Sequence, residues 1–362
     1  MRVFERMNFA RSVSFTVILA LAGCAHPQTT PPVPQTAEAL MEARKQKEIA
    51  FVTQQSEIAR LQLIGDRLRI GSAPLCSDLV PRFGWRILNQ FSFKPENREI
   101  ATAAYLLGDR LKVVHLTEDG PAERAGIQAG DELVRADDVD LLGADAAVKF
   151  GKIAKDSLTQ GKAVKLEVLR NGLSVPVELA GVAACNYPVS LLHAEKLNAS
   201  TNGQRIVVSE GLVRFTRDDT ELALVIAHEM SHDIRRHFEA QQKNADVGRA
   251  MGTLVDILAA LGGSYGNVYS SLGAKMGREA YSQEFEAEAD YVSLYVMALS
   301  GYDITHAPDF WRRIATVKPE EIDKGYTHPS TAKRFVALEA AVQEIHGKQT
   351  SGAELRPQTK KN

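Results

Sequence analysis

The segment that decides the fold is LALVIAHEMSHDIRRHF, residues 222–238, in which an apolar run leads directly into a cluster of charge. Residues 217–238 are predicted to form one helix. His228 and His232 are four residues apart, so on a helix both imidazoles project from one face, about one turn apart. Burying them with Glu229 next to an apolar run costs free energy unless an internal partner offsets it.

A single Zn²⁺ ion is the partner that this spacing indicates. Both ring nitrogens could bind one ion, and Glu229, next to the first histidine, would accept a proton from the attacking water. The alternative is a surface helix with a charged face, which the apolar run before the cluster disfavours. A third ligand close by in the metzincin pattern is excluded, because Arg235 and Phe238 stand where that pattern needs glycine and histidine.

The stretch YSQEFEAEADYVSLYVMALSGYD, residues 281–303, offers the third ligand. Glu286 has an aspartate four residues later, Asp290, so one helix face would present a ligand and a carboxylate able to hold a ligating imidazole. Glu284 and Glu288 are predicted to point away from that face as solvated charge. A catalytic zinc site with three protein ligands leaves the fourth position open for chemistry.

HEMSH followed by EAEAD resembles the gluzincin metallopeptidases, the family of HtpX, the CAAX prenyl protease and BepA. The resemblance covers about residues 35–75 and 185–346. It implies an α+β fold with a mainly helical, zincin-like peptidase domain and a small sheet. It also implies that Glu286 is the zinc ligand, that Asp290 supports the site, and that each chain holds one Zn²⁺.

The same resemblance assigns three further residues. The late element His328-Pro329 through Arg334 matches the family's H-P-x-x-x-x-R pattern. It implies that His328 lies near the metal, where a neutral imidazole would either stabilise an oxyanion or act as a removable fourth ligand. Asn198, which leads a predicted strand, and Arg334 are implied to contact the substrate.

Between the two parts of the peptidase, residues 76–185 read as an inserted β-rich domain. Asn171-Gly172 is a favoured hairpin turn, and Gly120-Pro121-Ala122 with Ala129-Gly130-Asp131 resembles bacterial PDZ domains. Such domains bind extended peptides at a sheet edge, so this one would have a peptide ligand. Its carboxylate loop is placed around Gly108, before the strand LKVVHL. A purely structural insertion is the alternative.

The first 23 residues read as an export signal with a basic start and a short apolar run. Leu21 through Cys24 resembles a bacterial lipobox, which implies lipidation at Cys24 and an outer-membrane protein facing the periplasm. Residues 24–35 would be a tether. In that oxidising compartment Cys76 and Cys185 are predicted to form a disulfide, with two free buried thiols as the alternative.

The remaining chain is assigned by pattern. Residues 36–75 open the peptidase domain with a long helix over 36–70, and residues 186–347 complete it, with helices at about 283–300, 306–317 and 331–346. Residues 348–362 are a predicted flexible tail. Residues 240–280 could be a lid, a partner surface or core. The net charge of −2 disfavours nucleic acid as a partner.

The sequence therefore predicts a lipid-anchored, periplasmic zinc endopeptidase of the bacterial cell envelope. Its substrates would be misfolded or misassembled envelope polypeptides, bound along the strand RIVVSEG, residues 205–211. The alternative is a non-enzymatic scaffold or assembly factor whose PDZ domain does the work and whose zinc is structural. An intramembrane protease is disfavoured, because it needs several transmembrane helices.

Overall fold

A computed structural model describes residues 29, 36–261, 267–279, 282–317 and 332–359. The chain divides into two compact units, Met1–Ile49 and Ala50–Asn362. Helix α2, Thr36–Gly71, spans the boundary, as its helical periodicity predicts. Its residues 36–50 are exposed, and they carry an ion pair from Arg44 Nε to Glu48 Oε1 of 3.2 Å. Buried apolar residues begin at Phe51, so only the second half of α2 contributes to a core.

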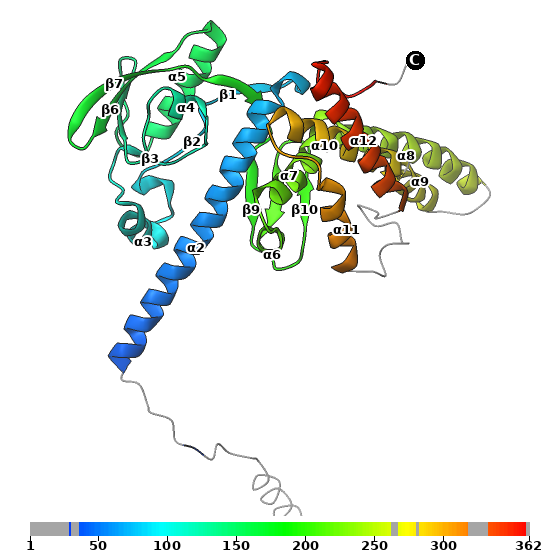
Figure 1. Cartoon of the computed structure of the whole chain (residues 1–362). Coiled ribbons are helices and arrows are strands. Elements are labelled where there is room, and N and C mark those ends of the chain that lie inside the picture. The colour runs from blue at the N-terminus through cyan, green and yellow to red at the C-terminus, as the bar shows by residue number, and fades with distance from the viewer. Residues whose placement is uncertain (1–28, 30–35, 262–266, 280–281, 318–331, 360–362) are drawn as a thin grey trace, which may run out of the picture. The chain divides into compact units, whose positions relative to one another are not determined.

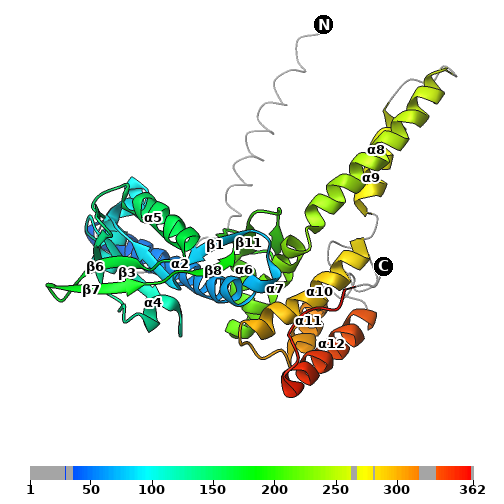
Figure 2. The same cartoon turned by 90° about the horizontal axis from the view of Figure 1, so that it is seen from above.

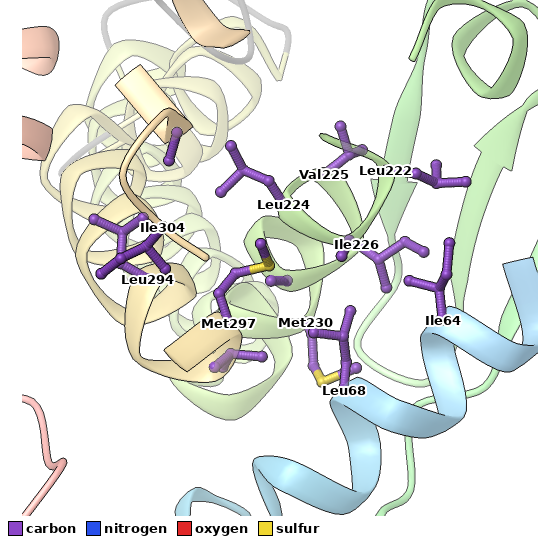
Figure 3. Packing of buried hydrophobic residues seen from close by; sticks show 14 of the residues in the cluster. Ile64, Leu68, Leu222, Leu224, Val225, Ile226, Met230, Leu294, Met297 and Ile304 are labelled. Atoms are coloured by element: carbon purple, nitrogen blue, oxygen red, sulfur yellow. The ribbon is translucent and has the colours of Figure 1, made fainter. Parts of the chain in front are cut away.

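The main core forms where α2 meets the helices α7, Asp219–Ile234, and α10, Ser282–Leu299. Figure 3 shows Ile64 and Leu68 of α2 on one side of α7, with Leu294 and Met297 of α10 on the other. Because α7 is apolar around its whole circumference over residues 222–227, it is buried between these neighbours.

A three-stranded sheet packs beside α7 in the order β10–β11–β9. The strands are β9, Val189–Leu192, β10, Ala199–Thr201, and β11, Ile206–Ser209. A short helix, α6, Glu210–Phe215, follows β11. Ser209 caps the start of this helix, because its hydroxyl accepts a hydrogen bond from Leu212 N (3.2 Å).

Two helix ends differ from the predictions. The helix expected to continue to Phe238 ends at Ile234, and Arg236 adopts a φ of 56°, which breaks the chain direction before α8. The last helix, α12, Ala332–Ser351, continues past Gly347 and ends at Gly352, whose φ of 67° a glycine adopts without strain. The other helices are α8, His237–Leu261, α9, Val268–Glu279, and α11, Ala307–Val317.

The expected flexible tail is also wrong for its described part, which ends at Thr359. Leu355 packs against the main core. The ammonium of Lys348 donates to the carbonyl of Arg356 (2.7 Å), and Gln358 N donates to the Tyr291 hydroxyl (3.0 Å). These contacts hold the segment after α12 against the main core.

The β-rich domain has its own core and an antiparallel sheet in the order β2–β3–β4–β6–β7, with β5 paired to β4. This PDZ-like region interrupts a mainly helical chain, so the predicted α+β class is confirmed (Figures 1 and 2). Its elements are listed here in chain order: β2, Trp85–Leu88, η2, Gln90–Ser92, α3, Pro95–Tyr105, β3, Leu111–Leu116, α4, Pro121–Arg124, β4, Glu132–Ala136, β5, Val139–Asp140, α5, Ala146–Gln160, β6, Val164–Arg170, and β7, Leu173–Leu179.

Two sequence-based predictions for this domain, the hairpin turn and the carboxylate loop, can be compared with its structure. Asn171 and Gly172 have φ values of 51° and 81° between β6 and β7, so the predicted hairpin turn is present. The carboxylate loop, by contrast, was placed wrongly. Strand β3 pairs with β2 on one side and β4 on the other, so LKVVHL is not an edge. Strand β2 is the edge beside α5, and the turn at Gly84, with a φ of 68°, leads into it.

The ends of the inserted domain are joined. After the short turn η1, Ala73–Leu75, strand β1, Leu79–Arg82, pairs antiparallel with β8, Val182–Cys185. Cys76 and Cys185 form a disulfide with a Cα–Cα separation of 5.6 Å. The entry and exit of the insertion are thereby held together next to the end of α2. Within the described ranges, no helix has the length and apolar character needed to cross a membrane.

Candidate metal centre

Helix α7 carries the first two candidate ligands, and its start is fixed by side chains. Asp218 Oδ1 accepts a hydrogen bond from Glu221 N (2.9 Å), and Glu221 Oε2 accepts one from Arg217 N (2.6 Å). These bonds satisfy backbone donors that a helix N-terminus leaves unpaired. The register that results buries every residue from Leu222 to Asp233, including both histidines.

His228, His232 and Glu286 meet at one point. The Nε2 atoms of the two histidines are 3.3 Å apart. Glu286 on α10 places Oε2 3.4 Å from His228 Nε2 and Oε1 3.5 Å from His232 Nε2. Ligands at about 2.0–2.1 Å from a tetrahedral zinc ion lie roughly 3.4 Å from one another. The three donors therefore fit one Zn²⁺ ion without rearrangement.

Asp290 holds His228 in the orientation that zinc requires. Its Oδ1 lies 3.0 Å from His228 Nδ1, so that nitrogen carries the proton and Nε2 is left for a metal. Arg334 donates to both oxygens of Asp290, at 2.6 and 2.7 Å, and stacks over Trp311 at 4.3 Å. Trp311 in turn contacts the edge of the His228 ring.

This geometry revises the expected role of Arg334. Its side chain is 7% exposed and its guanidinium is engaged by Asp290, so it is placed to position the site and not to contact a substrate. Burial by itself would raise the pKa of the Asp290 carboxyl, but Arg334 and His228 outweigh it, and the pKa is lowered. Asp290 thus stays ionised between two cationic or proton-donating partners.

A second support, which the sequence reading missed, holds His232. His237 Nδ1 lies 3.0 Å from His232 Nδ1, and His237 Nε2 lies 3.1 Å from Glu288 Oε2. The hydrogen bond from His237 lowers the pKa of Glu288 to about 2. Glu288 was expected to be solvated charge, and this contact corrects that expectation. The break at Arg236 turns the chain so that His237 faces the site, which helical periodicity could not reveal.

The two neighbouring carboxylates make the His228 imidazole strongly basic when no metal is bound. Burial lowers its pKa, but the hydrogen bonds and charges of Asp290 and Glu286 outweigh burial and raise the pKa to about 10. Two carboxylates around one imidazole therefore make the pocket favourable for positive charge. A divalent cation supplies that charge when the histidines are deprotonated.

Glu229 and the edge of the small sheet complete the site. Glu229 follows His228 on α7 and is 4% exposed. At the C-terminal end of α7, Asp233 accepts hydrogen bonds from Thr201 Oγ1 at 2.6 and 2.8 Å, which ties strand β10 to the helix. Burial raises the pKa of Asp233 to about 7 despite these bonds. Strand β10 is thus held next to the helix that carries the ligands.

The remaining predicted site residues are placed as follows. Asn198 is exposed immediately before β10, and its backbone exchanges hydrogen bonds with Ser209 at 3.0 and 2.9 Å. Cys24 and His328 lie outside the described residues. Lipidation at Cys24 and oxyanion stabilisation by His328 therefore stay predictions.

Parts of this chain are similar in sequence to known proteins. Residues 167–342 match the profile of Peptidase family M48. The beta-barrel assembly-enhancing protease of Yersinia pestis is 32% identical over 158 residues, which is 40% of this chain and 32% of that protein. The mitochondrial metalloendopeptidase OMA1 of Arabidopsis thaliana is 31% identical over 139 residues, 38% of this chain and 27% of that protein. The chain thus spans about a third of the curated relatives it matches.

Two solved structures are also similar. The HtrA3 PDZ domain bound to a phage-derived ligand is 17% identical and covers 29% of this chain and 88% of that chain, with a TM-score of 0.22. The HtrA-type protease AlgW with a decapeptide is 23% identical and covers 29% of this chain and 30% of that chain, with a TM-score of 0.23. The sequence match at residues 167–342 contains the ligand helices α7 and α10. The part of the chain that holds this site therefore matches peptidase family M48.

Proposed function

We propose that the protein is a zinc-dependent endopeptidase. The observation that carries the proposal is the triangle of His228, His232 and Glu286 donors, 3.3–3.5 Å apart, with Glu229 next to the first ligand on α7. A structural zinc site usually has four protein ligands and no adjacent carboxylate base. Among the described residues, one cluster of side chains could hold a metal ion, and it consists of His228, His232 and Glu286.

The residues divide the chemistry of peptide hydrolysis between them. When bound, zinc would polarise the scissile carbonyl and make a water molecule more acidic. Glu229 would take a proton from the attacking water and pass it to the nitrogen of the leaving amine as the C–N bond breaks. Asp290 and His237 would keep the two imidazoles oriented throughout.

An extended polypeptide would bind along β10. The strand first considered for this role, β11, is central and pairs with β10 and β9, so its backbone groups are already used. Strand β10 is an edge of the sheet and is tied to α7 through Thr201 and Asp233. A peptide that pairs with such an edge is bound through main-chain hydrogen bonds, which do not depend on its side chains. This mode of binding suits unfolded polypeptides of many sequences.

A second peptide site is proposed in the PDZ-like domain. A cavity of about 880 Å³ lies between edge strand β2, helix α5 and helix α2. Asp66 of α2 bonds to Arg82, just before the Gly84 turn, and to Arg69. A peptide whose carboxylate bound Arg82 would have to compete with Asp66, so ligand binding here would loosen a contact between this domain and α2.

The cellular role is proposed from the N-terminal sequence and from the relatives. We place the protein at the bacterial cell envelope, anchored by lipid at Cys24 to the outer membrane and facing the periplasm. Its substrates would be misfolded or misassembled envelope proteins. The lipobox-like sequence before Cys24 and a relative named beta-barrel assembly-enhancing protease support this assignment.

Zinc stoichiometry and hydrolysis of an unfolded, dye-labelled polypeptide test the proposal together. Wild type should bind one zinc per chain, and His232→Ala and Glu286→Ala should lose it. Glu229→Gln should keep the zinc and lose roughly 10²–10⁴-fold in rate. Zinc that survives Glu286→Ala would refute the ligand set. Zinc without hydrolysis in wild type would favour the non-enzymatic scaffold.

A further inference from the structure

Helices α8 and α9 form a hairpin, and glycine residues lie where the two helices contact each other. A Cβ added to Gly248 would lie 2.0 Å from the carbonyl oxygen of Gly273, and one added to Gly252 would lie 2.0 Å from that of Tyr269. The two backbones therefore touch along the pair seen side by side in Figures 1 and 2. Close approach through a G-x-x-x-G spacing is typical of helices that pack in lipid.

The large apolar side chains of the hairpin lie on its outside. A helix pair in water normally does the opposite and buries such side chains in its seam. The residues and their exposed fractions are Val247 54%, Met251 66%, Leu254 63%, Val255 45% and Ile257 55% on α8, and Val268 65%, Leu272 50% and Met276 63% on α9.

The end of the hairpin carries almost no charge. Asp256 is the one charged residue in the sequence from 250 to 274. Its carboxylate accepts hydrogen bonds from Tyr269 N (3.0 Å) and Ser270 N (2.8 Å), so it caps α9. Arg249 and Lys275 border this segment. An apolar end whose one carboxylate is hydrogen-bonded within the hairpin, with basic residues at its limit, matches the hydrocarbon and the anionic surface of a lipid leaflet.

The width and length of the apolar surface favour lipid over a second copy of the chain. Val255 and Ile257 are separated by about 160° around α8, with Met251 and Leu254 between them. A partner helix covers a narrower seam, whereas fluid lipid surrounds a helix. Residues 250–261 extend about 18 Å, close to the hydrocarbon depth of one leaflet, about 15 Å.

We propose that the α8–α9 hairpin inserts the apolar end of α8 and the start of α9, residues 250–261 and 267–274, into one leaflet of a phospholipid membrane. Helix α8 follows α7 directly, and α9 leads to α10, so the hairpin is joined to both helices that carry the candidate zinc ligands. Insertion would hold the site at the membrane surface. The sequence left a lid, a partner surface and core open for residues 240–280. Membrane insertion does not depend on peptidase activity or on an acyl chain.

An environment-sensitive fluorophore on single cysteines tests the insertion. The full chain carries Cys24→Ser to remove the acylation site, and the label is placed at Met251→Cys or, as a control, at Leu173→Cys, which is 71% exposed in the β-rich domain. With phosphatidylcholine vesicles, the label at 251 should shift to the blue and be quenched by nitroxides on lipid acyl chains. The label at 173 should do neither.

A second variant measures how much the apolar end contributes. With the label at Leu272→Cys, Met251→Asp should weaken vesicle partitioning about tenfold to a hundredfold, since a carboxylate in hydrocarbon is costly. A label at 251 that stays in water with vesicles present overturns the proposal. So does a blue shift without lipid that grows with protein concentration, because a second copy would then cover the hairpin.

Discussion

Replacing His237 by phenylalanine should weaken zinc binding although His237 is not a ligand. The substitution keeps an aromatic ring stacked on Phe285, at a centroid distance of 4.6 Å, and fills the same space. It removes the acceptor that lies 3.0 Å from His232 Nδ1. Glu288 keeps its ion pair with Arg235. The variant therefore removes two hydrogen bonds, one to His232 and one to Glu288, of which only the first reaches a candidate ligand.

The cost falls mainly on the zinc-bound state. Without metal, the His232 ring can place its proton on either nitrogen, but a metal at Nε2 fixes the proton on Nδ1. A buried N–H without an acceptor costs about 1–3 kcal/mol. At about 1.4 kcal/mol per tenfold, that is roughly a 5- to 150-fold rise in the zinc Kd, consistent with the roughly 10- to 100-fold effects of other supporting residues.

Competition with a fluorescent chelator of known zinc affinity measures this Kd. Arg235→Ala is the matched control, because it removes the other partner of Glu288 at an exposed ion pair that contributes little. Unfolding curves of both metal-free variants check that each is folded. The reasoning is refuted if His237→Phe weakens zinc no more than Arg235→Ala does.

Three further predictions concern stability and pH. Leu68→Ala, at a fully buried position between α2 and α7, should lower the free energy of unfolding by about 2–5 kcal/mol in urea titrations, whereas the exposed Leu173→Ala should change it little. Because burial raises the pKa of Asp233 to about 7, the folded state favours the protonated carboxyl, so this group's contribution to stability is lost as pH rises from about 4 to about 7. Asp233→Asn should therefore gain stability relative to wild type over that range in metal-free protein, and an unchanged difference would contradict the assignment. Reducing the disulfide Cys76–Cys185, which links residues 109 apart, should cost about 2–4 kcal/mol, with thermal melts of the Cys76→Ser/Cys185→Ser variant as the check.

Sequence reasoning succeeded where one local rule decided the result. The i, i+4 spacing of His228 and His232 on a helix is local, and so is the favoured turn at Asn171-Gly172. The spacing of Glu286 and Asp290 placed both on one face of α10. Local sequence rules failed at Arg236, because a positive φ for arginine has no sequence signal.

The sequence by itself determined the two ligand helices, the third-ligand candidate and the division into a peptidase and a β-rich insertion, because each follows from periodicity or spacing within a short segment. Only the tertiary structure decided that Arg334 binds Asp290 and that Glu288 reaches His232 through His237. It also decided that β2 and β10 are edge strands and that large apolar residues of α8 are exposed. These features depend on which distant segments pack together, and no local pattern encodes that.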